Sequence, residues 1–283
     1  MSVINTNVSA TLTQNAITKN ERAMSSAMEQ LATGKRINKA SDDAAGLAIA
    51  SRMTSQINGV GQAARNANDG ISLLQTADGA LVEVTNMLQR MRELAVQSAT
   101  DTNGTDDRAA LSKEYVALRT EIDRIGDNTQ WNGANILDGT AGASGKMNFQ
   151  VGANSGQTIT VTVPDFTTDS ASSGVLQGIK ASTIAGITTA TLANKAITAL
   201  DTAIKNINTE RSELGAAMNQ LGYAADNLLN VKANAEASRS RIEDTDYAAA
   251  TTELARTQII QQAATAMLAQ ANQIPQTVLA LLK

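Results

Sequence analysis

The sequence predicts a mainly α protein in which long antiparallel helices pack as coiled coils, with a small β-hairpin region between them. Three observations carry this prediction. Apolar residues recur at alternating intervals of three and four over long stretches of the chain, which is the spacing of a coiled-coil seam. Aromatic residues make up only 2% of the 283 residues, so a core must consist mostly of aliphatic side chains. A central segment between the helical stretches is rich in turn-forming residues.

The N-terminal segment carries the first helical pattern. Its apolar stripe consists of Ile17, Met24, Met28 and Leu31. We expect this helix to end near Gly34, because glycine readily adopts the left-handed conformation that follows a helix C-terminus. After a short basic joint, a second helix is expected to begin at residues 41–43, whose Ser and Asp side chains cap helices and complement the helix dipole.

Three further helical seams are expected before the C-terminal segment. The longest runs from residue 57 to residue 95, and one extra step of three after Leu74 indicates a local overwinding of the coil. A second seam covers residues 111–125, and a third covers residues 193–228 with Arg211 as its exception. Such narrow stripes predict long helices that pack against one another as coiled coils.

The central segment, residues 127–182, has a different pattern. Residues 147–151 and 159–163 alternate apolar with polar side chains, and a turn-rich stretch separates them. Alternation with a period of two indicates strands, so we expect a β-hairpin whose second strand Pro164 ends. The hairpin region is expected at about residues 138–182.

The C-terminal segment repeats the seam pattern at Ile260, Ala264, Met267, Ala271, Ile274, Val278 and Leu281. Antiparallel helices bring residues 1–40 and 240–283 together, and we expect the N-terminal stripe to pack against this C-terminal stripe. Two helices bury only one narrow seam, however, and helices owe most of their stability to packing. The remaining apolar surface therefore needs other copies of the chain. This predicts polymerisation through a self-assembly seam of Ile17, Met24, Met28, Leu31, Ile260, Met267, Ile274, Val278 and Leu281.

Composition argues against several classes of function. The chain has no Cys and no His, so thiol nucleophiles, cysteine-bound zinc and the commonest general base are missing. A net charge of −4 gives no basic surface for nucleic acid. The apolar runs fall far short of the ~20 residues that span a membrane, and no secretory signal is visible. We therefore expect no enzyme, metal site, cofactor, nucleic-acid partner or membrane partner.

Two groups of acidic residues allow more than one interpretation. Asp42 and Asp43 could form a carboxylate pair, but adjacent helical residues point in different directions, so helix capping is favoured. Glu243, Asp244 and Asp246 could suggest a metal site, but they lack the turn glycine and closing glutamate of a calcium loop. A solvated helix start is the favoured interpretation there.

Three longer motifs resemble one protein family. LATGKRIN at residues 31–38, followed by SDDAAGL at residues 41–47, resembles the N-terminal signature of bacterial flagellins. SRSRIEDTDY at residues 238–247 and LAQANQIPQ at residues 268–276 resemble the C-terminal signatures. The similarity extends over nearly the whole chain and is typical of a minimal flagellin with terminal and core domains only.

The resemblance implies a filament subunit that serves motility. Residues 1–44 and 240–283 would form a terminal coiled-coil domain in the inner tube, and residues 45–239 would form a core domain in the outer tube. It also implies an extracellular location, reached through the flagellar type III apparatus without a cleaved signal peptide. The implied partners are further copies in a helical homopolymer, an export chaperone, and the filament cap and hook-junction proteins.

Four residues resemble positions by which a vertebrate innate immune receptor detects some flagellins: Gln89, Arg90, Leu94 and Glu114. The alternative is that these residues pack against a neighbouring subunit, and both interpretations can hold if the receptor meets only the free subunit. For the chain as a whole, the alternative to a filament protein is a secreted helical bundle, such as a hook-junction or needle-tip component.

Overall fold

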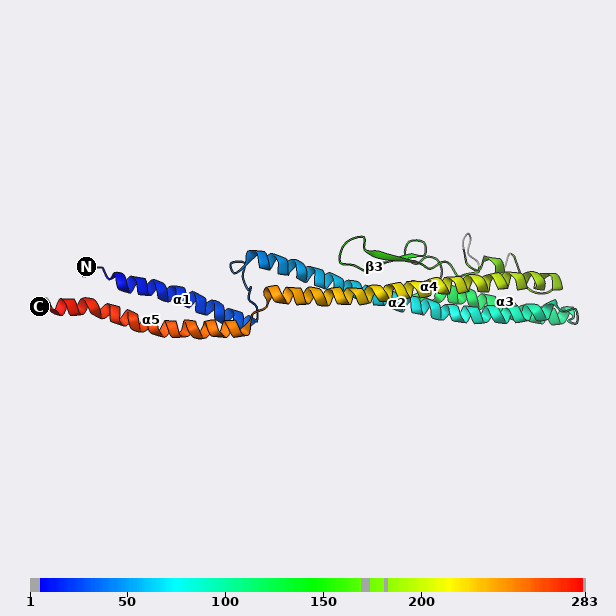
Figure 1. Ribbon diagram of the computed structural model, residues 1–283. Helices are drawn as coiled ribbons and strands as arrows, with labels where there is room; N and C mark the ends of the chain where they lie inside the picture. The colour runs from blue at the N-terminus through cyan, green and yellow to red at the C-terminus, as the bar shows by residue number, and fades with distance from the viewer. Residues whose placement is uncertain (1–5, 169–173, 181–182, 282–283) are drawn as a thin grey trace. The chain divides into compact units, whose positions relative to one another are not determined.

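The computed structural model describes residues 6–168, 174–180 and 183–281, with the backbone alone at residues 177 and 274–281. Over these residues the fold is mainly α, as predicted (Figure 1). The α-helices are α1 (Val8–Thr33), α2 (Ala44–Ala99), α3 (Thr105–Asn128), α4 (Ala190–Glu243) and α5 (Tyr247–Leu281), and a short 3-10 helix, η1, covers Gln177–Ile179. The strands are β1 (Gln130–Trp131), β2 (Ala134–Asn135), β3 (Lys146–Gln150) and β4 (Thr158–Thr162).

The contacts divide the chain into two compact units. The terminal unit comprises Met1–Ile57 and Ala233–Lys283, and the core unit comprises Asn58–Lys232. The long helices α2 and α4 each supply residues to both units. The predicted functional division, 1–44 with 240–283 against 45–239, concerns places in a filament and stays a prediction.

The core unit is built on the apolar seams that the sequence predicts. Along α2 the buried positions are Leu74, Ala77, Leu81, Val84, Leu88, Met91 and Ala95. They pack in one cluster with Tyr115 and Ile122 of α3 and with the α4 residues Leu200, Ile207, Leu214 and Leu221. Arg211, the exception in the α4 seam, is half-buried and donates from Nε to Asp78 Oδ1 at 2.7 Å. The predicted helical seams of the core unit are confirmed.

Polar side chains enter this core where they hold the segment before α4. Arg119 is buried although it follows the expected seam position Leu118, which is only half-buried. The reason is that Arg119 Nη1 donates to the carbonyl oxygen of Ile184 at 2.9 Å. Ser98 Oγ likewise donates to the carbonyl oxygen of Ile187 at 2.5 Å. An apolar pattern alone does not reveal such positions.

The predicted β-hairpin is formed by β3 and β4. The two strands pair antiparallel, with Phe149 opposite Ile159, and the hairpin rests on α2. Asn66 Nδ2 donates to the carbonyl oxygen of Gln150 at 3.2 Å. A Cβ atom at Gly70 would lie 2.9 Å from the Phe149 ring, so the missing side chain lets the hairpin approach the helix closely.

A second, smaller hairpin, β1–β2, was not predicted. Its strands pair antiparallel, with Trp131 opposite Ala134. The two turn residues, Asn132 and Gly133, have φ angles of 50° and 79°. Two such residues with positive φ are typical of a tight hairpin turn, for which Asn-Gly is the preferred dipeptide. The signal was therefore present in the sequence.

The terminal unit pairs α1 with α5 in antiparallel orientation (Figure 1). Asn7 Nδ2, at the start of α1, donates to the carbonyl oxygen of Ala271 at 2.9 Å. Thirteen residues later the direction is confirmed, because Asn20 Nδ2 donates to the carbonyl oxygen of Thr257 at 2.8 Å. Helix α1 ends at Gly34 in the left-handed conformation, with φ of 71°, as predicted.

The acidic groups at the joint serve local structure. Asp43 Oδ1 accepts from the backbone N–H of Gly46 at 2.9 Å and so caps α2, as favoured. Asp42 accepts from the backbone N–H groups of Lys39 and Asn38 at 2.9 and 3.1 Å. These hydrogen bonds stabilise the charged form and lower the pKa of Asp42.

The second acidic group, Glu243, Asp244 and Asp246, connects the segment after α1 with the segment between α4 and α5. Lys35 forms an antiparallel bridge with Asp244, and its ammonium group lies 2.5 Å from Glu243 Oε1. Asp246 Oδ1 accepts from the backbone N–H of Ala248 at 2.9 Å and so caps the start of α5. The helix-start interpretation therefore holds for Asp246 alone, because Glu243 is the last residue of α4 and its side chain is only 15% exposed.

Candidate assembly surface

The seam between α1 and α5 is a stripe of buried and half-buried residues at alternating intervals of three and four. On α1 it consists of Ala10, Thr13, Ile17, Asn20, Met24, Ala27 and Leu31. On α5 it consists of Ala250, Leu254, Thr257, Gln261, Ala264, Leu268 and Ala271. Three of the predicted N-terminal residues, Ile17, Met24 and Leu31, thus face the partner helix.

Other predicted residues lie outside this seam. Met28, Ile260 and Met267 are 46%, 39% and 63% exposed. The prediction that Ile260 and Met267 pack against the N-terminal stripe is wrong, because α5 turns a different row of residues toward α1. That row contains Thr257 and Gln261, whose polar side chains interrupt the apolar periodicity on which the prediction rested.

Three predicted residues, Ile274, Val278 and Leu281, belong to α5. Their side chains lie outside the described residues, so their part in self-assembly stays a prediction.

Helix α5 leaves an exposed apolar face beside the seam. We call it the apolar flank, and it consists of Ile259, Ile260, Ala263, Ala266 and Met267. The other side of the same helix is polar, with exposed Gln258 and Thr265. Surface residues that are singly apolar are common, but a contiguous apolar row on one side of a thin helical pair indicates a protein interface.

Comparison with known proteins identifies the family. The sequence profile of the bacterial flagellin N-terminal helical region matches residues 4–142, and that of the C-terminal helical region matches residues 197–282. A flagellin from Halalkalibacterium halodurans is 49% identical over 257 residues, which are 91% of this chain and 91% of that protein. The chain belongs to the bacterial flagellins.

A second relative agrees with this assignment. A flagellin from Xenorhabdus nematophila is 42% identical over 314 aligned positions, which cover 100% of this chain and 99% of that flagellin. The crystal structure of Bacillus cereus flagellin is 38% identical, with a TM-score of 0.49, over 58% of this chain and 88% of that one. This flagellin is therefore a structural subunit of the extracellular flagellar filament, and its 283 residues fit a minimal form. The family match favours this reading over a hook-junction or needle-tip component.

Three of the four receptor-like residues of this flagellin are exposed. Arg90 donates from Nε to Glu114 Oε1 at 3.0 Å and from Nη1 to Glu93 Oε2 at 2.9 Å, and Gln89 is exposed beside it. Leu94 is only 1% exposed and belongs to the core cluster. In the folded subunit the side chains of Gln89, Arg90 and Glu114 are therefore accessible to another protein, whereas the side chain of Leu94 is not.

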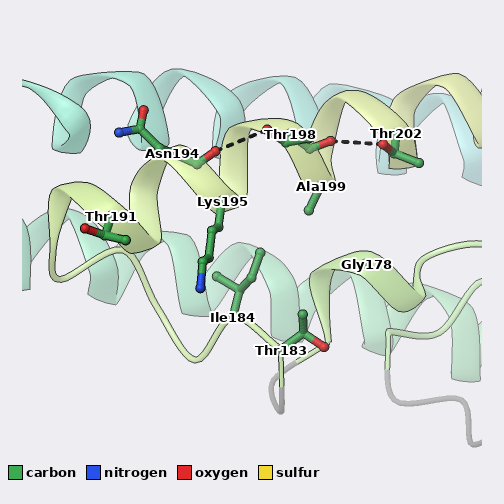
Figure 2. A pocket seen from close by; sticks show the side chains of 9 residues that line it. All are labelled: Gly178, Thr183, Ile184, Thr191, Asn194, Lys195, Thr198, Ala199 and Thr202. Atoms are coloured by element: carbon green, nitrogen blue, oxygen red, sulfur yellow. Dashed lines mark hydrogen bonds between the residues drawn. The ribbon is translucent and has the colours of Figure 1, made fainter.

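The core unit also contains a cavity of about 700 Å³ beside α4 (Figure 2). Among the described residues that line it, Lys195 alone is charged. The hydroxyl groups of Thr198 and Thr202 donate to the carbonyl oxygens of Asn194 and Thr198 on their own helix, at 3.4 and 3.0 Å.

Within the part of the chain that the structure describes, no three carboxylates lie close enough together to hold a metal ion. No helix of these described residues has both the length and the apolar character needed to cross a membrane.

Proposed function

We propose that this flagellin polymerises into the filament that drives bacterial motility, and that the apolar flank of α5 is a main contact between copies. In this proposal the terminal coiled coil, 1–44 with 240–283, forms the inner tube. The core domain, 45–239, with the hairpin region at about 138–182, forms the outer tube. The observation that carries the proposal is the exposure of large apolar residues on the α1–α5 pair, which no other helix of the described residues covers.

The energetic argument rests on three side chains. Ile259, Ile260 and Met267 are 67%, 39% and 63% exposed in the single chain. Burying a large aliphatic side chain contributes roughly 1.5–3 kcal/mol relative to full exposure, and each copy in a helical polymer makes the same contact again. Neighbouring copies would cover these residues together with Met28, and the predicted residues Ile274, Val278 and Leu281 would extend the contact.

A matched set of charge substitutions tests the proposal. Ile260→Asp and Met267→Asp place a carboxylate on the apolar flank, whereas Gln258→Asp and Thr265→Asp place the same carboxylate on the polar side of the same helix. A charge buried without a partner costs several kcal/mol, so the first two variants should lose filaments and the last two should keep them. Electron microscopy after seeding gives the readout, and circular dichroism checks the fold. Normal filaments from Met267→Asp would contradict the assignment of the flank.

We further propose that this flagellin is exported by the flagellar type III apparatus without cleavage of its N-terminus. An export chaperone would cover the apolar flank until export, and the filament cap and hook-junction proteins would contact the ends of the assembled filament. Mass determination of the secreted protein tests the first point, because an N-terminus shortened by a leader peptide would rule it out. Loss of chaperone binding in Ile260→Asp, with binding kept in Gln258→Asp, would support the second point.

A second candidate function is recognition of the free subunit by an innate immune receptor. It is favoured by the ion pair between Arg90 and Glu114, which holds two exposed charged groups from α2 and α3 in a fixed relation. We expect Arg90→Ala to weaken receptor activation in a reporter-cell assay. Arg92→Ala is the matched control, because Arg92 lies on the same helix and pairs with Asp201 instead. Equal effects of the two variants would contradict the proposal.

A further inference from the structure

Methionine is the only sulfur-containing residue type in this chain, because the nine Met are accompanied by no Cys. The described methionines differ sharply in exposure. Met91 is fully buried in the core, whereas Met28 and Met267 stand out as the exposed ones and both lie on the terminal helical pair. The thioethers that a dissolved oxidant reaches most easily are thus concentrated on the proposed assembly surface.

The side chain of Met267 is 63% exposed. Of the four residues one turn away on α5, Ala263, Ala264 and Ala271 carry only a methyl group, and Gln270 is itself exposed. Met267 also lies within the apolar flank, next to Ile260 in the row of residues seven apart. The same side chain is therefore accessible in the free subunit and, under the proposed function, covered in the filament.

We propose that Met267 is an oxidation-sensitive switch of assembly, with Met28 as a second and weaker site. Hydrogen peroxide transfers one oxygen atom to the thioether, so the sulfur loses two electrons and becomes a sulfoxide, and the peroxide is reduced to water. The sulfoxide is polar and accepts hydrogen bonds, and burying it in an apolar contact without a donor is unfavourable. Oxidation of the free subunit therefore blocks its incorporation, and incorporation protects the sulfur.

The test begins with free subunits treated with hydrogen peroxide. Peptide mass spectrometry should find sulfoxide first at Met267 and Met28, while Met91 stays reduced. We expect the critical concentration for seeded assembly to rise by roughly tenfold or more, since a polar group is left unpaired in the contact. A methionine sulfoxide reductase with a thiol reductant should restore assembly. Circular dichroism should show an unchanged helical core.

Two variants assign the effect to one residue. Met267→Leu keeps the apolar bulk without the sulfur and should lose most of the peroxide effect on assembly, with only the weaker contribution of Met28 left. Met28→Leu leaves Met267 oxidisable and should still be blocked. In assembled filaments, peroxide should oxidise Met267 at least about tenfold more slowly than in free subunits, because the contact excludes solvent.

The inference rests on the proposed assembly role, but the two can fail separately. Normal assembly of subunits that carry sulfoxide at Met267 would overturn the switch and leave the filament function standing. Equal oxidation rates in free subunits and filaments would overturn it as well. Failure of untreated subunits to form filaments would overturn the proposed function and the switch together.

Discussion

The core and terminal units both consist of long helices packed along seams of the same spacing, yet they use different residues. In the core seam, Leu81, Leu88 and Met91 are completely buried. In the terminal seam, polar residues such as Asn20 and Gln261 occupy equivalent positions, while the large Met267 lies outside. The core seam thus buries its large apolar residues, whereas the terminal unit leaves Met28, Ile259, Ile260 and Met267 exposed beside its seam.

The buried polar layer of the terminal unit shows what holds two helices together in place of a large core. Asn20 is 8% exposed, and its amide donates to the Thr257 carbonyl oxygen and, at 3.1 Å, to Gln261 Oε1. Gln261 in turn donates to Glu21 Oε1 at 3.1 Å. Buried polar groups are tolerated when they are hydrogen-bonded, and a single polar layer favours one register in a coiled coil.

The apolar residues of the α5 seam repeat along the helix, so they do not define its register. Ala250, Ala264 and Ala271 fall at intervals of seven or fourteen, and so do Leu254 and Leu268. Apolar packing alone would therefore be similar after a shift by two turns. The layer at Thr257 and Gln261 breaks this repetition, because a shifted α5 would place Leu or Ala opposite the Asn20 amide.

The largest expected contrast between the units is the loss of unfolding free energy when one leucine of the seam is replaced by alanine. Leu88→Ala should lower the free energy of unfolding of the core by about 2–5 kcal/mol, because it leaves a cavity in a fully packed seam. Leu268→Ala removes the same atoms from the half-buried terminal seam and should leave the core transition unchanged. Urea denaturation of the free subunit, followed by circular dichroism, measures both. Equal losses would mean that the two units unfold as one.

The next contrast concerns a buried polar group without a partner. Tyr115 is fully buried, and its hydroxyl finds no hydrogen-bond partner among the described residues, unlike the Asn20 amide. Burial raises the pKa of Tyr115 to about 12, with the charge of Arg119 opposing the shift. Since this folded-state pKa lies above the unfolded value of about 10, the unfolded chain loses the proton first as pH rises.

Stability should therefore be unaffected by this group below pH 10 and should fall between pH 10 and pH 12, by up to roughly 3 kcal/mol. Tyr115→Phe should flatten that part of the pH profile and should be as stable as the parent, or slightly more stable, at pH 7. Urea unfolding at a series of alkaline pH values provides the measurement. An identical alkaline profile in the variant would show that the hydroxyl is not buried in the folded subunit.

The same contrast explains which features could be predicted from the sequence. The core seam of α2 was predictable because each of its seam positions from Leu74 to Ala95 is apolar and buried, so pattern and packing coincide. The terminal seam was predictable in direction and in its α1 half, but not in its α5 half, since Thr257 and Gln261 are buried by hydrogen bonding. Leu94 is the opposite case: it resembles a contact residue, yet it is buried between the seam residues Met91 and Ala95, and its part in recognition stays a prediction.

The smallest expected effect concerns two glycines in the middle of α4. A Cβ atom at Gly215 or Gly222 would meet no other atom of the described residues within 4 Å, and neither has a positive φ. Nothing in the described part of the chain therefore requires glycine there, and glycine in a helix interior costs about 1 kcal/mol relative to alanine. Gly215→Ala and Gly222→Ala should each raise the free energy of unfolding of the core by about 0.4–1 kcal/mol.

Gly70→Ala is the matched control on α2, because its Cβ atom would lie 2.9 Å from the Phe149 ring and 3.2 Å from Leu221. That variant should lose stability, or shift the β3–β4 hairpin, although the substitution is the same. Urea denaturation separates the three. If Gly222→Ala stabilises the free subunit but impairs filament growth, a neighbouring copy needs the space beside α4, and the core unit too would carry a surface shaped for assembly. If Gly222→Ala stabilises the subunit and leaves filaments normal, no neighbouring copy needs the space beside Gly222. The proposed contact between copies then remains on the terminal unit, and the contrast between the two units becomes sharper.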